Sequence, residues 1–368
     1  MAAQTAFSTN TDVSQAVLEI SRQLQSEGMK TVVFFASPLY DPVLLAHGMQ
    51  QAFPKVPTWG CSTAGEIVSG RLLTHSLVAM ALPSDLIDNL SIEVVEGLQQ
   101  GASPVAAAKK LGFYFEKDIA RMDHRHYVGV ILMDGLSNAE ERVMDQLGNL
   151  TDIIFIGGSA GDDMRFVVTH VYAQGKAYTN AALLVLLKPR RPFEILKTQS
   201  FCALNRKLVA TKVDADRRTV LEFNHRPAVT EYASAISADA ATVTDQFMHH
   251  PVGLMIDGQP YVRSPQRTDQ QAIVFFCQVL EGTELALLES TNIVTDTAKA
   301  LEEKKKAMDG ISAILNFHCI LRTLELEKKG QTDAYAKLFS DIPTIGFSTY
   351  GEAYIGHINQ TSTMLLLK

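Results

Sequence analysis

The sequence has few cysteines, a single tryptophan and no long apolar segment. Its 368 residues include four cysteines, Cys61, Cys202, Cys277 and Cys319, too far apart for a zinc knuckle, a Cys-x-x-Cys redox pair or a haem attachment motif. The longest apolar run, Ala181 to Leu187, is far shorter than the roughly 20 residues that span a bilayer. We therefore expect reduced thiols and no membrane-spanning helix.

An excess of basic residues is also missing. Lysine and arginine number 33 against 40 acidic residues, so the formal net charge is −7. This charge repels nucleic acid and anionic lipid surfaces, and no local basic patch compensates for it. The first ten residues contain neither a basic flank nor an apolar stretch. The expectation is a cytoplasmic protein without nucleic-acid or membrane partners.

A repeated segment is the clearest feature of the sequence. The ten residues from Pro57 to Glu66 recur as Pro343 to Glu352, with seven of the ten positions identical. A shorter relative, Ile156 to Asp162, lies between them and has lost one residue before its last glycine. Repetition at a fixed offset is the signature of a duplicated structural unit.

The surroundings of the three copies repeat as well. Each copy follows a buried strand and a helix, and another helix precedes each strand. The expected strands are 31–36, 127–133 and 311–318, the helices after them 42–53, 139–150 and 323–339, and the helices before them 12–27, 103–122 and 292–309. Plausible N-caps of the preceding helices are Thr11, Ser103 and Asn292. The pattern predicts an α/β protein built from helix, strand, helix and strand units whose glycine-rich loops face a shared region.

The glycine segments lead into further strands, expected at 77–82, 167–172, 182–187 and 364–367. A phosphate-binding loop would instead open a helix, which disfavours a nucleotide site. The glycines then supply either positive φ or close backbone approach. Two interpretations remain open: a repeated tight turn that binds nothing, or loops that converge on a ligand.

A domain boundary is expected near Arg226. The residues from Phe193 to Phe223 resemble strands broken by the turn at 214–216, and Arg226-Pro227-Ala228 opens a helix over 229–236. The predicted domains are therefore residues 1–225 and 226–368.

In these segments the chain resembles the FIST family, proteins made of an N-terminal and a C-terminal FIST domain. The resemblance rests on 59–66, 157–162, Arg226-Pro227-Ala228, His250-Pro251-Val252-Gly253, Tyr261-Val262-Arg263-Ser264, Cys319-Ile320-Leu321-Arg322 and 346–352. It implies a small-ligand sensor in signal transduction. One branch of the family looks like haem-binding nitric-oxide sensors that regulate a histidine kinase in trans.

The resemblance also suggests where a ligand binds. His250 occupies the family's histidine-proline-glycine position, and Pro251 favours an extended backbone before it, so His250 is the expected haem ligand, with His249 as its competitor. Arg263 and Arg322 are candidates for a ligand carboxylate or a haem propionate, or for a bridge to Glu66 or Glu352. Cys319, Gly346 and Ser348 complete the expected site, although Cys319 also fits a small buried hydrophobe.

An enzyme is not expected. The spacing Gly-x-Ser-x-x-Gly around Ser62 differs from the nucleophile elbow Gly-x-Ser-x-Gly, and no acid and base stand near it at motif spacing. Three hypotheses remain: a haem-based gas sensor, a sensor of an organic metabolite such as an amino acid, and a protein-interaction scaffold. The expected partners are the small ligand or gas and a histidine kinase or another signalling enzyme in trans. The sequence leaves homo-oligomerisation open.

Overall fold

The computed structural model describes residues 2–24 and 28–368, which form two compact units. Unit 1 consists of Met1–Lys197, Ala298–His357 and Ser362–Lys368, and unit 2 of Thr198–Thr297 and Ile358–Thr361. Residues 25–27 of the helix expected over 12–27 lie outside the described residues. The family-domain boundary expected at 225/226 stays a prediction, because compactness divides the chain by a different criterion.

Unit 1 contains three repeats of the same order of elements. The first repeat comprises β1 (Gln4–Ser8), α1 (Val13–Gln23), β2 (Met29–Ala36), α2 (Pro42–Ala52), β3 (Thr58–Ser62), β4 (Glu66–Val68), β5 (Arg71–Leu73) and β6 (Leu77–Pro83). The second comprises β7 (Ile87–Glu96), η1 (Leu98–Gln100), α3 (Val105–Tyr114), η2 (Ile119–Arg121), β8 (Val128–Met133), α4 (Glu140–Gly148), β9 (Phe155–Ser159), β10 (Val171–Ala173), β11 (Lys176–Tyr178) and β12 (Ala181–Pro189). The third comprises β13 (Phe193–Gln199), α6 (Ile293–Ala307), β22 (Ala313–Cys319), α7 (Ile320–Lys328), α8 (Thr332–Lys337), β23 (Thr344–Thr349), β24 (Glu352–Tyr354), β25 (His357–Ile358) and β26 (Thr361–Leu367).

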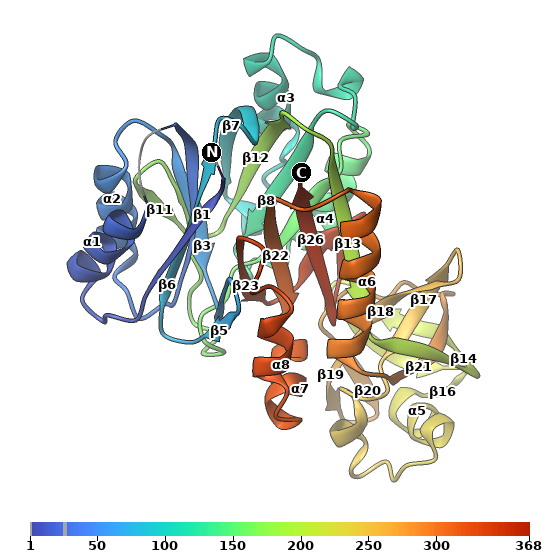
Figure 1. Ribbon diagram of the computed structural model, residues 1–368. Helices are drawn as coiled ribbons and strands as arrows, with labels where there is room; N and C mark the ends of the chain where they lie inside the picture. Colours follow the sequence, from blue (N-terminus) through green and yellow to red (C-terminus); the bar gives the residue numbers. More distant parts are fainter. Residues whose placement is uncertain (1, 25–27) are drawn as a thin grey trace. The chain divides into compact units, whose positions relative to one another are not determined.

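Each repeat builds the centre of one six-stranded mixed sheet (Figure 1). A parallel pair lies at the centre of each sheet: β2 with β3, β8 with β9, and β22 with β23. The last long strand of the repeat, β6, β12 or β26, adds to this pair in the antiparallel direction. The predicted α/β class and the predicted unit of helix, strand, helix and strand are confirmed.

The small hairpin of each repeat pairs with the sheet of another repeat. Hairpin β4–β5 of the first repeat extends the third sheet along β23, and β10–β11 of the second repeat extends the first sheet along β3. Hairpin β24–β25 of the third repeat extends the second sheet along β9. The exchange therefore closes a ring in which every sheet is completed by its neighbour.

Glycines inside β3, β9 and β23 allow these strands to approach their parallel partners β2, β8 and β22 closely. A Cβ at Gly60 would lie 1.6 Å from the carbonyl oxygen of Phe34, and one at Gly346 would lie 2.1 Å from that of Asn316. Gly157 is equally constrained by Ile131, at 1.8 Å. Of the two roles expected for the glycines, close approach applies here, because these three residues lie in strands and not in a turn.

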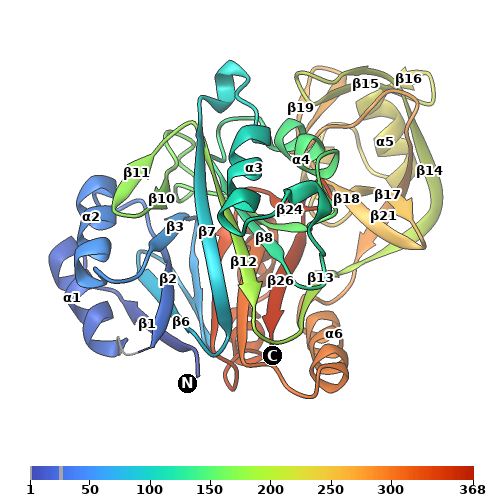
Figure 2. The ribbon, with the colours of Figure 1, turned by 90° about the horizontal axis from the view of Figure 1, so that it is seen from above.

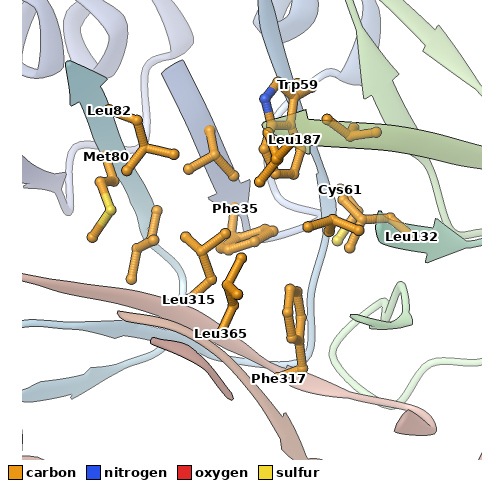
Figure 3. Packing of buried hydrophobic residues seen from close by; sticks show 14 of the residues in the cluster. Phe35, Trp59, Cys61, Met80, Leu82, Leu132, Leu187, Leu315, Phe317 and Leu365 are labelled. Carbon is orange, nitrogen blue, oxygen red and sulfur yellow. The ribbon is translucent and has the colours of Figure 1, made fainter. Parts of the chain in front are cut away.

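The three sheets of unit 1 share one apolar core. Side chains from β2, β3, β6, β8, β12, β22 and β26 point toward one another in Figure 3, including Phe35, Leu132 and Phe317. Phe35 contacts both Phe317 and Phe347, with ring centroids 6.5 Å and 4.5 Å away. The first two sheets each have a second apolar face that helices cover: α1 and α2 cover that of the first sheet, and α3 and α4 that of the second (Figure 2). The core thus joins residues from the beginning, middle and end of the chain.

Unit 2 is inserted into the third repeat, between β13 and α6. It contains an eight-stranded sheet, one α-helix and its own apolar core. Its elements are β14 (Phe201–Asp214), β15 (Thr219–Phe223), β16 (Arg226–Pro227), α5 (Ala228–Ile236), η3 (Val243–Gln246), β17 (Val252–Ile256), β18 (Gln259–Arg263), β19 (Pro265–Asp269), β20 (Ala272–Phe275) and β21 (Glu284–Ser290). The strands expected on both sides of 214–216 and the helix expected over 229–236 are confirmed.

Some local expectations were wrong. The helix expected over 323–339 is two helices, because Gly330 adopts a positive φ of 63° between α7 and α8. The N-cap of α1 is Asp12 and not Thr11, since the Asp12 side chain accepts a hydrogen bond from the amide of Gln15. The strand expected over 167–172 forms only from Val171 onward. Among the described residues, no helix is both long and apolar enough to cross a membrane.

Replacing Gly60 by alanine should prevent folding of unit 1 or reduce its free energy of unfolding by at least about 3 kcal/mol, because the new methyl group collides with the Phe34 carbonyl. Urea unfolding followed by the emission of Trp59, which is buried in unit 1, measures the effect. Gly148→Ala is the control, since its methyl group meets nothing within 4 Å and should stabilise α4 by roughly 0.5–1 kcal/mol. Wild-type stability of Gly60→Ala would contradict the close-approach role.

Candidate functional site

The three glycine segments meet and bond to one another inside unit 1. The carbonyl oxygen of Ser62 accepts a hydrogen bond from Gly161, 3.0 Å away, in the second repeat. The Ser159 carbonyl accepts one from Tyr350 in the third repeat at 3.1 Å, and the Ser348 carbonyl accepts one from Ala64 in the first at 3.2 Å. The prediction that the glycine-rich segments face a shared region is therefore confirmed. We call this set of contacts the serine ring.

The glutamates that end the first and third segments hold the turns in place. The Thr63 hydroxyl donates to Glu66, and the Thr349 hydroxyl donates to Glu352 at 2.5 Å. Glu66 also accepts hydrogen bonds from the hydroxyl of Ser76 at 2.6 Å and from its amide at 3.1 Å. Burial raises the pKa of Glu66 to about 8, against the hydrogen bonds that favour the charged form. These contacts give both glutamates a role in fixing backbone.

Asp162, at the corresponding place in the second segment, has a different environment. Its carboxylate accepts hydrogen bonds from the amides of Phe166, Val167 and Val168, at 2.9, 2.6 and 3.0 Å. The hydroxyl of Tyr350 donates to it at 2.5 Å. Burial opposes the charged form, but these hydrogen bonds outweigh it and lower the pKa of Asp162. A charged Asp162 therefore fixes the loop that follows it.

The structure brings together four of the residues expected to bind the ligand, all in the third repeat. Gly346 lies beside Asn316 in the parallel pair β22–β23, and Cys319 lies beside Thr349. Ser348 lies next to Thr323, the neighbour of Arg322 along the chain, with their hydroxyl oxygens 2.8 Å apart. Cys319 and Arg322 are almost fully buried. These residues line the carboxyl ends of parallel strands, where α/β sheets commonly bind ligands.

A buried polar chain continues from this group beneath α7 and α8. The hydroxyl of Ser362 donates to Asn316 at 2.7 Å, and the amide group of Asn316 donates to the Tyr335 hydroxyl at 3.4 Å. That hydroxyl lies 3.0 Å from Nδ1 of His318. Burial and the charge of Arg322 lower the pKa of His318 well below its usual value, so its imidazole is neutral. Within the described part of the chain, His318 Nε2 is buried without a hydrogen-bond partner.

His250 and Arg263 belong to unit 2, where His250 lies two residues before β17 and Arg263 ends the neighbouring strand β18. Arg263 pairs with Val252 in the β17–β18 ladder, two residues after His250. Nδ1 of His250 lies 3.3 Å from the carbonyl oxygen of Leu288, and the Tyr232 hydroxyl donates to the His250 carbonyl. His249 lies beside Ser290, with Nδ1 3.4 Å from its hydroxyl. Both histidines are half-buried.

Two groups of polar residues were missed by the sequence reasoning. The first is Tyr335, whose hydroxyl is hydrogen-bonded to Nδ1 of His318. A single tyrosine within a helical pattern gives no signal of such a contact. Glu140, Glu141 and His357 form the second group, with ligand atoms within 4.8 Å of one another and 3.1 Å between His357 Nδ1 and Glu141 Oε1. More than 200 residues separate His357 from the two adjacent glutamates, so no motif spacing reveals the group.

Comparison with known proteins agrees with this architecture. The family model of the FIST N domain matches residues 30–226, and that of the FIST C domain matches residues 228–354. An uncharacterised protein of Methanocaldococcus jannaschii is similar as well, with 22% identity over 314 residues that cover 79% of this chain. The chain spans about three fifths of the length of that relative, since the match covers 60% of it.

The raised pKa of Glu66 predicts a stability that falls as the pH rises. Between its unfolded value of 4.5 and its folded value of about 8, the folded protein binds more protons than the unfolded chain, so alkali favours unfolding. From pH 5.5 to 8.5 the wild type should lose roughly 2–4 kcal/mol more than Glu66→Gln in urea unfolding followed by Trp59 emission. The control is Glu327→Gln, which changes an exposed carboxylate and should follow the wild type. Parallel pH profiles of wild type and Glu66→Gln would rule out a protonated Glu66.

Proposed function

Because the chain belongs to the FIST family, whose members are generally small-ligand sensors in signal transduction, we propose that it senses a small ligand and signals to a separate protein. The ligand we propose is nitric oxide, taken up by haem that is bound non-covalently in unit 2. One observation carries this choice: the contact of His250 Nδ1 with the Leu288 carbonyl oxygen.

The contact matters because it selects a tautomer. A carbonyl oxygen only accepts hydrogen bonds, so Nδ1 of His250 must carry the proton, and Nε2 keeps its lone pair. Histidines that bind metal commonly donate their other N–H to a carbonyl or carboxylate, which fixes the ring and raises its basicity. The Tyr232 hydroxyl, bonded to the His250 carbonyl, steadies the backbone behind this ring.

Arg263 is placed to support the same ligand. Its Nη1 donates to the Val262 carbonyl at 3.2 Å, and the other guanidinium donors suit a propionate. Haem, when bound, supplies the iron that takes up nitric oxide. His250 would hold the iron through Nε2, with its ring oriented by the Leu288 carbonyl, and Arg263 would pair with a propionate through its charge.

The remaining parts of the proposal follow the family resemblance. We propose that the protein acts in the cytoplasm, that it is not an enzyme, and that ligand uptake changes its contact with a histidine kinase in trans. Cys319, Arg322, Gly346 and Ser348 stay predicted ligand contacts. In unit 1 these four lie among buried groups that bond to one another, so direct contact with a ligand would require those groups to separate.

Haem titration tests the proposal. Wild-type protein should bind haem at one equivalent and show a Soret band, and His250→Ala should lower haem affinity at least about tenfold or shift this band. His249→Ala is the matched control, because its ring contacts Ser290 and should leave the spectrum nearly unchanged. Arg263→Ala should weaken binding by roughly 5–10-fold without shifting the band, because a propionate contact does not touch the iron.

The outcomes separate the hypotheses. An unchanged spectrum in His250→Ala would reject His250 as the ligand. A wild-type protein that never binds haem would leave the sensor of an organic metabolite, which calorimetric titration with amino acids would examine next. A protein that binds neither haem nor metabolites would be a protein-interaction scaffold.

A further inference from the structure

The second repeat contains a loop that the other two repeats lack. In each sheet, the first hairpin residue pairs with the residue just before the repeat serine: Val171 with Cys61, Glu66 with Phe347, and Glu352 with Gly158. Glu66 and Glu352 each follow the serine of their own repeat by four positions, but Val171 follows Ser159 by twelve. The extra eight residues, 163–170, are not needed for the hairpin exchange, because the first and third repeats pair their hairpins with another sheet and have no such loop.

This inserted loop is held in a strained conformation. Asp163, Met164 and Phe166 have positive φ values of 53°, 59° and 53°, a region that side chains other than glycine, asparagine and aspartate rarely adopt. The Asp162 carboxylate offsets this backbone strain by accepting hydrogen bonds from three amides of the loop. The ring of Phe166 stacks on Tyr350, with centroids 5.0 Å apart. These contacts therefore hold the loop in one conformation despite the strain.

The tip of the loop is apolar and exposed, next to a second exposed apolar segment. Seven of the fourteen large hydrophobic side chains exposed among the described residues lie in these two segments, with exposed fractions from 39% to 75%. We name them the apolar edge: Leu39, Val43, Leu44, Met164, Phe166, Val167 and Val168.

Polar contacts join the two segments of the apolar edge. The hydroxyl of Ser37 donates to Asp163 at 3.0 Å, and Nη2 of Arg165 lies 3.5 Å from the Pro38 carbonyl oxygen. The Asp41 carboxylate caps α2 by accepting hydrogen bonds from the amides of Val43 and Leu44, and these bonds fix the position of the first turn of that helix. The apolar edge is consequently one surface made of two anchored segments.

The size of this surface indicates its occupant. From the exposed fractions, its apolar area is on the order of 700 Å², more than the roughly 300–600 Å² of the largest patch on a typical monomer. A stable interface needs roughly 800 Å² from each partner, which two copies of this surface nearly supply. We propose that the apolar edge is the interface of a homodimer, in which it packs against the same surface of a second copy.

Composition and charge favour a second copy over a transient signalling partner. Homodimer interfaces are more apolar than transient ones, and all seven members of the apolar edge are aliphatic, methionine or phenylalanine. The surface also carries both signs of exposed charge, Asp41 and Arg165, so it does not repel itself. A partner recognised by charge would need an excess of one sign there.

Sedimentation equilibrium of the 368-residue chain tests the homodimer. The wild type should have twice the mass of the 40.3 kDa chain at micromolar concentration. Val167→Glu and Val43→Glu each place a charge in the interface, and each should raise the dimer dissociation constant at least about 100-fold. Because both are among the most exposed of the large hydrophobic side chains that the structure describes, the variants should keep the far-ultraviolet circular dichroism and the melting temperature of the wild type.

Phe113→Glu is the matched control, because it makes the same kind of change at a side chain that is 81% exposed on α3. It should leave the dimer intact. A wild type that stays monomeric at about 100 μM would overturn the proposal. So would a dimer that Val167→Glu and Val43→Glu leave unchanged, since it would then use another surface. Haem binding plays no part in these outcomes, so they stand apart from the proposed function.

Discussion

The serine ring is the interaction on which unit 1 depends. Each repeat has a serine at or next to the end of β3, β9 or β23, and the carbonyl of this serine accepts a hydrogen bond from an amide of another repeat. The hairpin that follows pairs with the sheet of another repeat. The repeated residues follow from these contacts between repeats. Glycine is needed where two backbones lie close together, and the buried threonine hydroxyls are hydrogen-bonded to the glutamate carboxylates. The repeated residues are therefore explained by packing within unit 1, before any role in ligand binding.

Function is best sought where the repeats differ from one another. The third repeat places histidine, asparagine and tyrosine beneath its helices, where the first repeat has an apolar cluster. It also accommodates unit 2 between β13 and α6, and unit 2 contains the candidate haem histidine. The second repeat carries the inserted loop. Each of these departures is confined to one repeat, so the architecture that the three repeats share does not require it.

Strands and helices with strong patterns could be predicted from the sequence, and contacts between distant segments could not. The strands at 31–36 and 127–133 follow from short apolar runs, and the helix over 42–53 follows from apolar residues spaced three and four apart. The hairpin exchange could not be seen, because a three-residue strand such as Glu66–Val68 has no periodicity and its partner Phe347 is far away in the chain. The apolar pattern also predicted one continuous helix over 323–339. It could not show the break at Gly330, because that break depends on the positive φ of this glycine. Of the candidate site, the group around Cys319 and Ser348 could be predicted, because both residues lie at the carboxyl ends of strands that the repeat aligns. The tautomer of His250 depends on Leu288, which no local pattern connects to it.

The exchange of hairpins has a consequence for how such a unit arises. Each repeat gives its hairpin to the preceding one, and the first gives its hairpin to the third, so the handover is cyclic. Three separate chains of one repeat could make the same handover around a threefold axis, as in domain-swapped oligomers. The covalent links near Ser84 and Arg190 are thus connections between members of a ring that is already closed by strand pairing. Gene fusion of a trimer would need only these short connections, after which each copy is free to acquire its own insertion.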